Sequence, residues 1–174
     1  MITVVQVPVQ EAETIVRSRA LAAGSRFQPQ DGGVLAHLTL LGPFMAEADI
    51  HDGVIADLER YFADVVAFDY TIEGVSTFPD GPTYLVPEPA TVFRRLTHGL
   101  LRCFPEFPPY GGVFEEVVPH ISVPLLDGED AESLRKQIGH RLPIEARASA
   151  ATLVRWAEGD TCTLATFPFG TTAA

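Results

Sequence analysis

The stretch that decides the fold runs from Val34 to Phe44 and has the sequence VLAHLTLLGPF. Most of its residues are apolar and suited to burial, yet it carries one titratable side chain, His37. Successive side chains of a strand point to opposite faces, so His37 and Thr39 project together, away from Leu38 and Leu40. The stretch therefore predicts a strand with one core face and one polar face.

A second stretch further along the chain, residues 117–126, repeats this arrangement with the sequence VVPHISVPLL. Here His120 and Ser122 share one face, and Ile121 and Val123 share the other. If the two strands lie side by side, two imidazoles and two hydroxyls converge in one cleft. We therefore treat the two histidine strands as halves of one candidate site.

Length and charge limit the classes of protein that fit this chain. With 174 residues and 47% hydrophobic content, the sequence predicts a single domain over residues 1–174. The formal net charge of −11 disfavours binding to long nucleic acid, which requires many phosphate-neutralising cations. No apolar run is long enough to cross a bilayer, and the first residues lack a secretory pattern, so we expect no membrane association and a cytoplasmic location.

The remaining elements are predicted from hydrophobic periodicity and turn residues. We expect Asp49 to cap the second helix. A short echo, Thr77-Phe78-Pro79 and Thr166-Phe167-Pro168, suggests two related lobes about a pseudo-twofold axis. The expected order is strand 2–9, helix 11–23, strand 35–41, helix 50–62, strands 65–78 and 83–86, helix 90–104, strand 117–126, helix 129–139, and a hairpin of 146–157 with 161–167.

Two imidazoles and two hydroxyls suit phosphodiester chemistry. A neutral imidazole can take a proton from an attacking hydroxyl or water, and an imidazolium can give one to a leaving oxygen. Hydroxyl groups can donate hydrogen bonds to phosphate oxygens as charge develops. Neither motif supplies a second metal ligand, and Cys103 and Cys162 form no metal or disulfide pattern, so we expect no metal and no cofactor. The alternative at each histidine is a buried residue bonded to the backbone.

The tetrapeptides HLTL at 37–40 and HISV at 120–123, with the continuation HLTLLGPF and Pro119 before the second histidine, resemble the paired signature of the 2H phosphoesterase superfamily. This superfamily includes 2′-5′ RNA ligase-like proteins and cyclic phosphodiesterases. The resemblance implies an α+β fold, a bilobal single domain in which antiparallel sheets line a central cleft with helices outside. It also implies a metal-independent site in which His37 and His120 act as general base and acid while Thr39 and Ser122 hold the phosphate.

The resulting hypothesis is an enzyme that hydrolyses a 2′,3′-cyclic phosphate or a 2′-5′ phosphodiester of a small nucleotide or RNA end. The alternatives are a 2′-5′ RNA ligase and a non-catalytic module that binds a nucleotide or RNA end. We expect a monomer. The candidate substrate-binding residues are a loop arginine and four aromatic residues near the two motifs, which could hold a phosphate or stack on a base: Arg26, Phe44, Tyr84, Tyr110 and Phe114.

Overall fold

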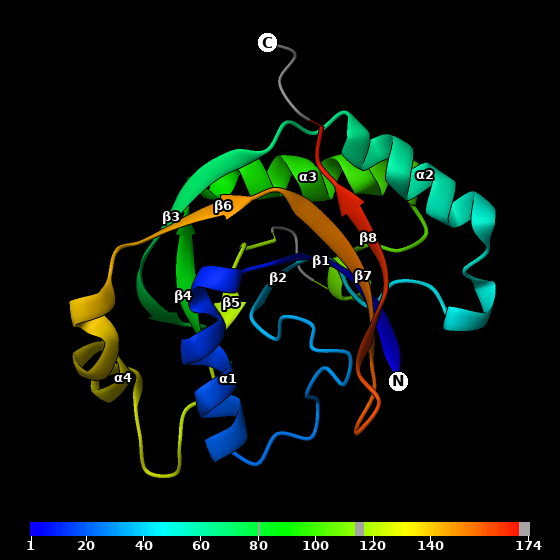
Figure 1. Cartoon of the computed structure of the whole chain (residues 1–174). Helices are drawn as coiled ribbons and strands as arrows, with labels where there is room; N and C mark the ends of the chain where they lie inside the picture. Colours follow the sequence, from blue (N-terminus) through cyan, green and yellow to red (C-terminus); the bar gives the residue numbers. More distant parts are fainter. Residues whose placement is uncertain (80, 114–116, 171–174) are drawn as a thin grey trace.

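The computed structural model describes residues 1–79, 81–113 and 117–170, which form an α+β domain with two antiparallel four-stranded sheets (Figure 1). The first sheet has the strand order β2-β1-β7-β8 and the second has the order β5-β4-β3-β6. Each sheet therefore carries one histidine motif at its edge. The strands are β1 (Ile2–Pro8), β2 (His37–Leu41), β3 (Phe68–Thr77), β4 (Thr83–Glu88), β5 (Ile121–Ser122), β6 (Ile144–Ala148), β7 (Ala150–Trp156) and β8 (Cys162–Pro168).

Four α-helices in the described part of the chain cover these sheets. In Figure 1, α2 and α3 lie along the top of the view and α1 and α4 lie below. Phe62 of α2 stacks on Phe167 of β8, and Phe93 of α3 packs edge-on against Tyr70 of β3, so the helices close the core of both sheets. No helix among the described residues is long and apolar enough to span a membrane. The helices are α1 (Glu13–Ala22), α2 (Asp52–Ala63), α3 (Ala90–Cys103) and α4 (Ala131–Ile138).

The predicted α+β class with two antiparallel sheets is confirmed, and the two histidine strands hold equivalent edge positions. The repeated Thr-Phe-Pro segments, from which two related lobes were predicted, lie at different positions in the two sheets. Phe78 directly follows β3, the third strand of its sheet, whereas Phe167 lies in β8, the fourth strand of the other sheet. Each sheet has a motif strand at one edge, but the Thr-Phe-Pro segments do not occupy equivalent places in the two sheets.

Three local predictions were wrong in their boundaries. The cap of α2 is His51, whose Nδ1 accepts a hydrogen bond from the Gly53 amide, rather than Asp49. The predicted strand 146–157 is two strands, because the chain passes from one sheet to the other at Ser149, between β6 and β7. The second histidine strand is only two residues long, since prolines at 119 and 124 flank it and cannot donate to a ladder.

Candidate active site

The two histidine motifs meet where the sheets touch. β2 is the edge strand of one sheet and β5 is the edge strand of the other, and the two strands lie in contact. His37 is the first residue of β2, and His120 directly precedes β5. The charge of His120 acts on the pKa of His37, which agrees with two imidazoles that lie near each other. The convergence expected from the sequence is therefore present.

Burial follows the alternation expected along both motifs. In β2, His37 and Thr39 are partly exposed, whereas Leu38 and Leu40 are buried. Around β5, His120 is partly exposed and Ser122 is exposed, whereas Ile121 is buried. Each motif therefore turns its polar pair away from the core.

The His37 ring is oriented by the backbone just before β2. Its Nδ1 lies 2.7 Å from the carbonyl oxygen of Leu35. A carbonyl can only accept, so this contact places the proton on Nδ1 and leaves the Nε2 lone pair of the neutral ring free. The segment itself is fixed by Glu13 of α1, whose Oε2 accepts hydrogen bonds from the amides of Leu35 and Ala36 at 2.9 and 2.8 Å.

His120 repeats the same local geometry. Its Nδ1 lies 2.8 Å from the carbonyl oxygen of Val118, again two residues earlier in the chain. The neutral ring therefore also carries its proton on Nδ1 and keeps Nε2 free. Two imidazoles held in the same tautomer by the same backbone contact form a matched pair. A backbone bond at each histidine was expected only as the alternative to a catalytic role, and the carbonyl that accepts it depends on the backbone path before each strand.

Both imidazoles have a lowered pKa. Burial lowers the pKa of His37, and the nearby charge of His120 lowers it further, while the hydrogen bond to Leu35 and the charge of Glu13 act in the opposite direction. Burial also lowers the pKa of His120, opposed by its hydrogen bond to Val118. Each ring is therefore mainly neutral at pH 7, with a lone pair available on Nε2.

The hydroxyl groups of Thr39 and Ser122 are available to bind a ligand oxygen. Thr39 lies opposite Gln6 in the β1–β2 ladder, and Ser122 lies opposite Tyr84 in the β4–β5 ladder. Within the described residues, neither hydroxyl has a recorded hydrogen-bond partner. Each can therefore donate to a ligand oxygen without breaking an internal bond.

Aromatic rings surround both histidines. Phe78 and Tyr84 lie 5.0 and 5.5 Å from the His120 ring, centroid to centroid, and Tyr110 stacks against it at 6.4 Å. Trp156 lies 4.8 Å from the His37 ring, centroid to centroid. The predicted residues Tyr84 and Tyr110 are thus beside the motifs, whereas Phe78 and Trp156 were not among the predicted contacts.

Tyr110 also joins the two lobes through its backbone. Its amide donates to the carbonyl oxygen of Gly42, just after β2, at 2.8 Å. Its φ of 53° lies in the left-handed region, which costs a non-glycine residue about 1–2 kcal/mol. Backbone strain of this kind is found more often at ligand-binding sites, which supports Tyr110 as a candidate substrate contact.

The other three candidate contacts lie elsewhere or cannot be placed. Phe44 is buried and packs edge-on against Phe104 and Phe107, so its expected role in stacking on a base is replaced by core packing. Arg26 points to the tip of the β7–β8 hairpin, where it pairs with Glu158 at 2.5 Å in solvent. Phe114 lies outside the described residues.

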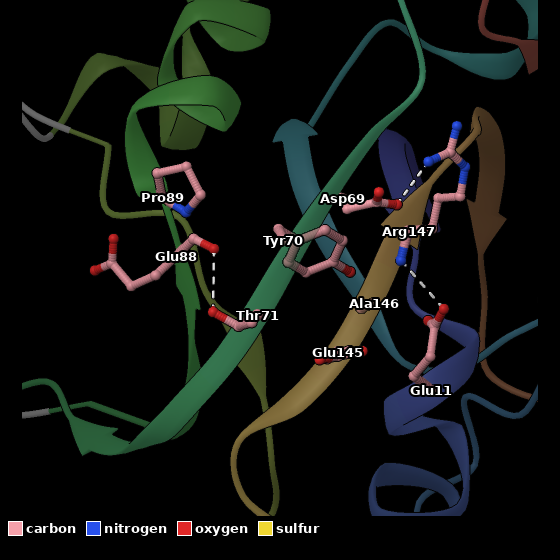
Figure 2. A pocket seen from close by; sticks show the side chains of 9 residues that line it. All are labelled: Glu11, Asp69, Tyr70, Thr71, Glu88, Pro89, Glu145, Ala146 and Arg147. Atoms are coloured by element: carbon pink, nitrogen blue, oxygen red, sulfur yellow. Dashed lines mark hydrogen bonds and ion pairs between the residues drawn. The ribbon is translucent and has the colours of Figure 1, made fainter.

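A separate hollow of about 720 Å³ opens over β3 and β6 (Figure 2). Glu11, Asp69, Glu88 and Glu145 line it, and its one arginine, Arg147, pairs with Asp69 at 2.6 Å. This surplus of negative charge repels phosphate, and none of the motif residues borders the hollow. Among the described residues, no cluster of three or more histidine, cysteine or acidic side chains is arranged to hold a metal ion.

Comparison with known proteins agrees with this geometry. The most similar solved structures include TT0787 of Thermus thermophilus (TM-score 0.68, 20% identity, 99% of this chain and 100% of that chain) and E. coli LigT complexed with 3′-AMP (TM-score 0.59, 18% identity, 97% and 98%). At these identities the likeness establishes the fold alone. A search of functionally curated proteins gives no significant match. The family model described as the 2′-5′ RNA ligase superfamily matches residues 5–160, and the chain therefore belongs to this superfamily, as its paired histidine motifs indicate.

Proposed function

We propose that this protein is a phosphoesterase that hydrolyses a 2′,3′-cyclic phosphate or a 2′-5′ phosphodiester of a small nucleotide or RNA end. The observation that carries the proposal is the matched histidine pair. Each imidazole is fixed by an Nδ1 contact to the carbonyl two residues earlier, has Nε2 free, and precedes a hydroxyl residue on the same face. A core histidine can make the same backbone contact, so the argument for catalysis rests on the hydroxyl residue that accompanies each ring on its face and on the electrostatic coupling of the two rings.

In the proposed reaction, His37 is the base and His120 is the acid. We assign the base to His37 because burial and the charge of a protonated His120 both favour its neutral form. Burial lowers the pKa of His120 as well, so only a fraction of the protein holds this pair of protonation states at pH 7. His37 Nε2 takes a proton from water as the water oxygen attacks phosphorus. The bond from phosphorus to the ribose oxygen breaks, and His120 Nε2 gives its proton to that oxygen. Thr39 and Ser122 donate hydrogen bonds to the non-bridging oxygens.

Charge supports a phosphodiester as the substrate. All 12 basic residues of the chain lie in its described part, and none makes a recorded contact with the four motif side chains. One imidazolium balances the single charge of a phosphodiester, whereas a monoester would need a second cation, such as the other imidazole in its protonated form. The acidic surface adds a further preference for a short substrate over a long RNA.

Substitution of each motif histidine tests the proposal. His37→Gln and His120→Gln should each lower kcat on a 2′,3′-cyclic nucleotide or 2′-5′ dinucleotide by about 10²-fold or more, the effect of losing one acid or base. His140→Gln is the matched control, because His140 is exposed on the short turn after α4. Activity should persist in EDTA.

Three outcomes would count against hydrolysis by this mechanism. Unchanged turnover in both motif variants would remove the assigned roles. Activity lost in EDTA and restored by zinc would indicate a metal enzyme. Binding of the nucleotide with no cleavage would indicate a non-catalytic module. Because a ribose hydroxyl could replace water as the nucleophile, the assay also includes paired RNA ends to detect ligation.

A further inference from the structure

The His37 ring has a second neighbour that comes from outside its own motif. Trp156 ends β7, which is separated from β2 by β1 in the sheet. Its indole reaches across β1 so that the two ring centroids lie 4.8 Å apart with their planes tilted by 38°. The imidazole therefore has a backbone acceptor at Nδ1 and an aromatic ring against one side.

The indole is itself held by a buried polar residue of the intervening strand. Trp156 Nε1 donates to Gln6 Oε1 at 3.0 Å, and Gln6 is only 1% exposed. A buried amide costs stability unless it is hydrogen-bonded, and a buried indole N–H needs an acceptor. Gln6 stands among valines in β1, so its partner Trp156 gives the physical reason for a polar side chain there.

Strand register explains how this pair reaches the site. Gln6 lies opposite Thr39 in the β1–β2 ladder and opposite Thr152 in the β1–β7 ladder. Residues directly opposite one another share a face, so Gln6 lies on the face that carries His37 and Thr39. Trp156 is four residues after Thr152 on the same strand and shares that face. The neighbouring residue Arg155 points to the other side and pairs with Glu47 and Asp160.

We propose that Trp156, anchored by Gln6, is the positioning residue of His37: the indole fixes the imidazole that Leu35 orients and keeps water from the ring face turned toward it. As a role in catalysis, this inference rests on the proposed function, in which His37 is the base. A rotation of the imidazole would break its bond to Leu35 and drive the ring into the indole. The direction of Nε2 is therefore fixed, as a base requires.

The titration of His37 gives a direct test. In histidine-labelled protein, NMR follows the pKa and tautomer of each ring in the wild type, Trp156→Phe and Gln6→Met. Both substitutions remove the indole–amide bond and should let water reach the imidazole, so the pKa of His37 should rise toward the ordinary histidine value. The other groups that act on His37 are His120 across the cleft and Glu13 of α1, and neither is changed. His140 serves as the internal reference, because it is exposed on the short turn after α4, away from both motifs in the chain.

Thr152→Val is the matched control. It alters the same row of the sheet at a buried position, and the Thr152 hydroxyl has no hydrogen-bond partner within the described residues, so the His37 pKa should stay at its wild-type value. Should Trp156→Phe fail to fold, Gln6→Met carries the same test. The wild type alone must also show a nuclear Overhauser contact between the indole and imidazole protons.

An unchanged or lowered His37 pKa in the variants, or a missing Overhauser contact in the wild type, overturns the inference. A lowered value would mean that the indole stabilises the imidazolium through its π face instead of excluding water. If the protein cleaves phosphodiesters, kcat should also fall, by up to about 10²-fold. If the His37 pKa shifts in the variants but the protein cleaves no phosphodiester, the positioning contact stands and the proposed function fails. If the protein cleaves phosphodiesters but the His37 pKa does not shift, the proposed function stands and the positioning contact fails.

Discussion

Arg19 of α1 forms a buried ion pair with Glu129, just before α4, and its removal should destabilise the fold strongly. The two side chains are 9% and 8% exposed. Arg19 Nε also donates to the carbonyl oxygen of Pro124 at 2.9 Å, and Glu129 Oε2 accepts from the Leu126 amide at 3.1 Å. Because Pro124 is two residues beyond Ser122, this ion pair also ties down the chain that leaves the second motif.

The magnitude follows from what Arg19→Ala leaves behind. Glu129 would remain buried as a carboxylate without its cation, and breaking a buried pair from one side costs about 3–5 kcal/mol. That is a large part of the roughly 5–15 kcal/mol by which domains are stable. For a domain of this size, a loss of 1 kcal/mol lowers Tm by about 2–4 °C, so Tm should fall by roughly 6–20 °C.

Urea unfolding followed by circular dichroism measures this loss. Arg60→Ala is the control, because Arg60 and Asp57 form an ion pair on α2 whose side chains are 73% and 52% exposed. An exposed pair contributes about 0–1 kcal/mol, so the control should unfold almost as the wild type does. The double variant Arg19→Met with Glu129→Leu should recover most of the loss, since it leaves no unpaired buried charge. If Arg19→Ala cost no more than Arg60→Ala, the argument from buried charge would be refuted.

Three further predictions concern the pH dependence of activity, the pH dependence of stability, and helix capping. His37 must be neutral to act as the base and His120 must be protonated to act as the acid, so kcat/KM should be bell-shaped in pH. Because burial lowers both pKa values, the maximum should lie below the ordinary histidine value of about 6.5, and a maximum above that value contradicts the assignment. The pKa values of His37 and His120 are lower in the folded chain than in the unfolded chain, so as pH falls the unfolded chain takes up protons before the folded chain does. The free energy of unfolding should therefore decrease as pH falls below about 6.5. Asp130→Ala removes the cap of α4, an acceptor 2.8 Å from the Ser133 amide, and should lower the urea concentration at the midpoint of unfolding; an unchanged midpoint would show that the cap is dispensable.

The sequence predicts those features of the site that depend only on residues close together in the chain. Alternation of side chains along a strand is a steric property of the backbone, so the shared face of His37 and Thr39 follows from their spacing alone. The same rule holds for His120 and Ser122, although β5 is only two residues long. The tautomer of each ring was beyond prediction, because it depends on where the carbonyl two residues earlier points.

The sequence by itself thus determined the two polar faces, the α+β class and the superfamily, because local spacing and motif identity carry that information. Only the tertiary structure decided which aromatic rings meet those faces. Phe44 follows the first motif closely in sequence yet packs into the core, while Trp156 comes from a distant strand to contact His37. Such contacts depend on strand order and register, as when Ser149 divides one alternating segment between two sheets. These arrangements are fixed by the packing of the whole chain rather than by any short segment of it.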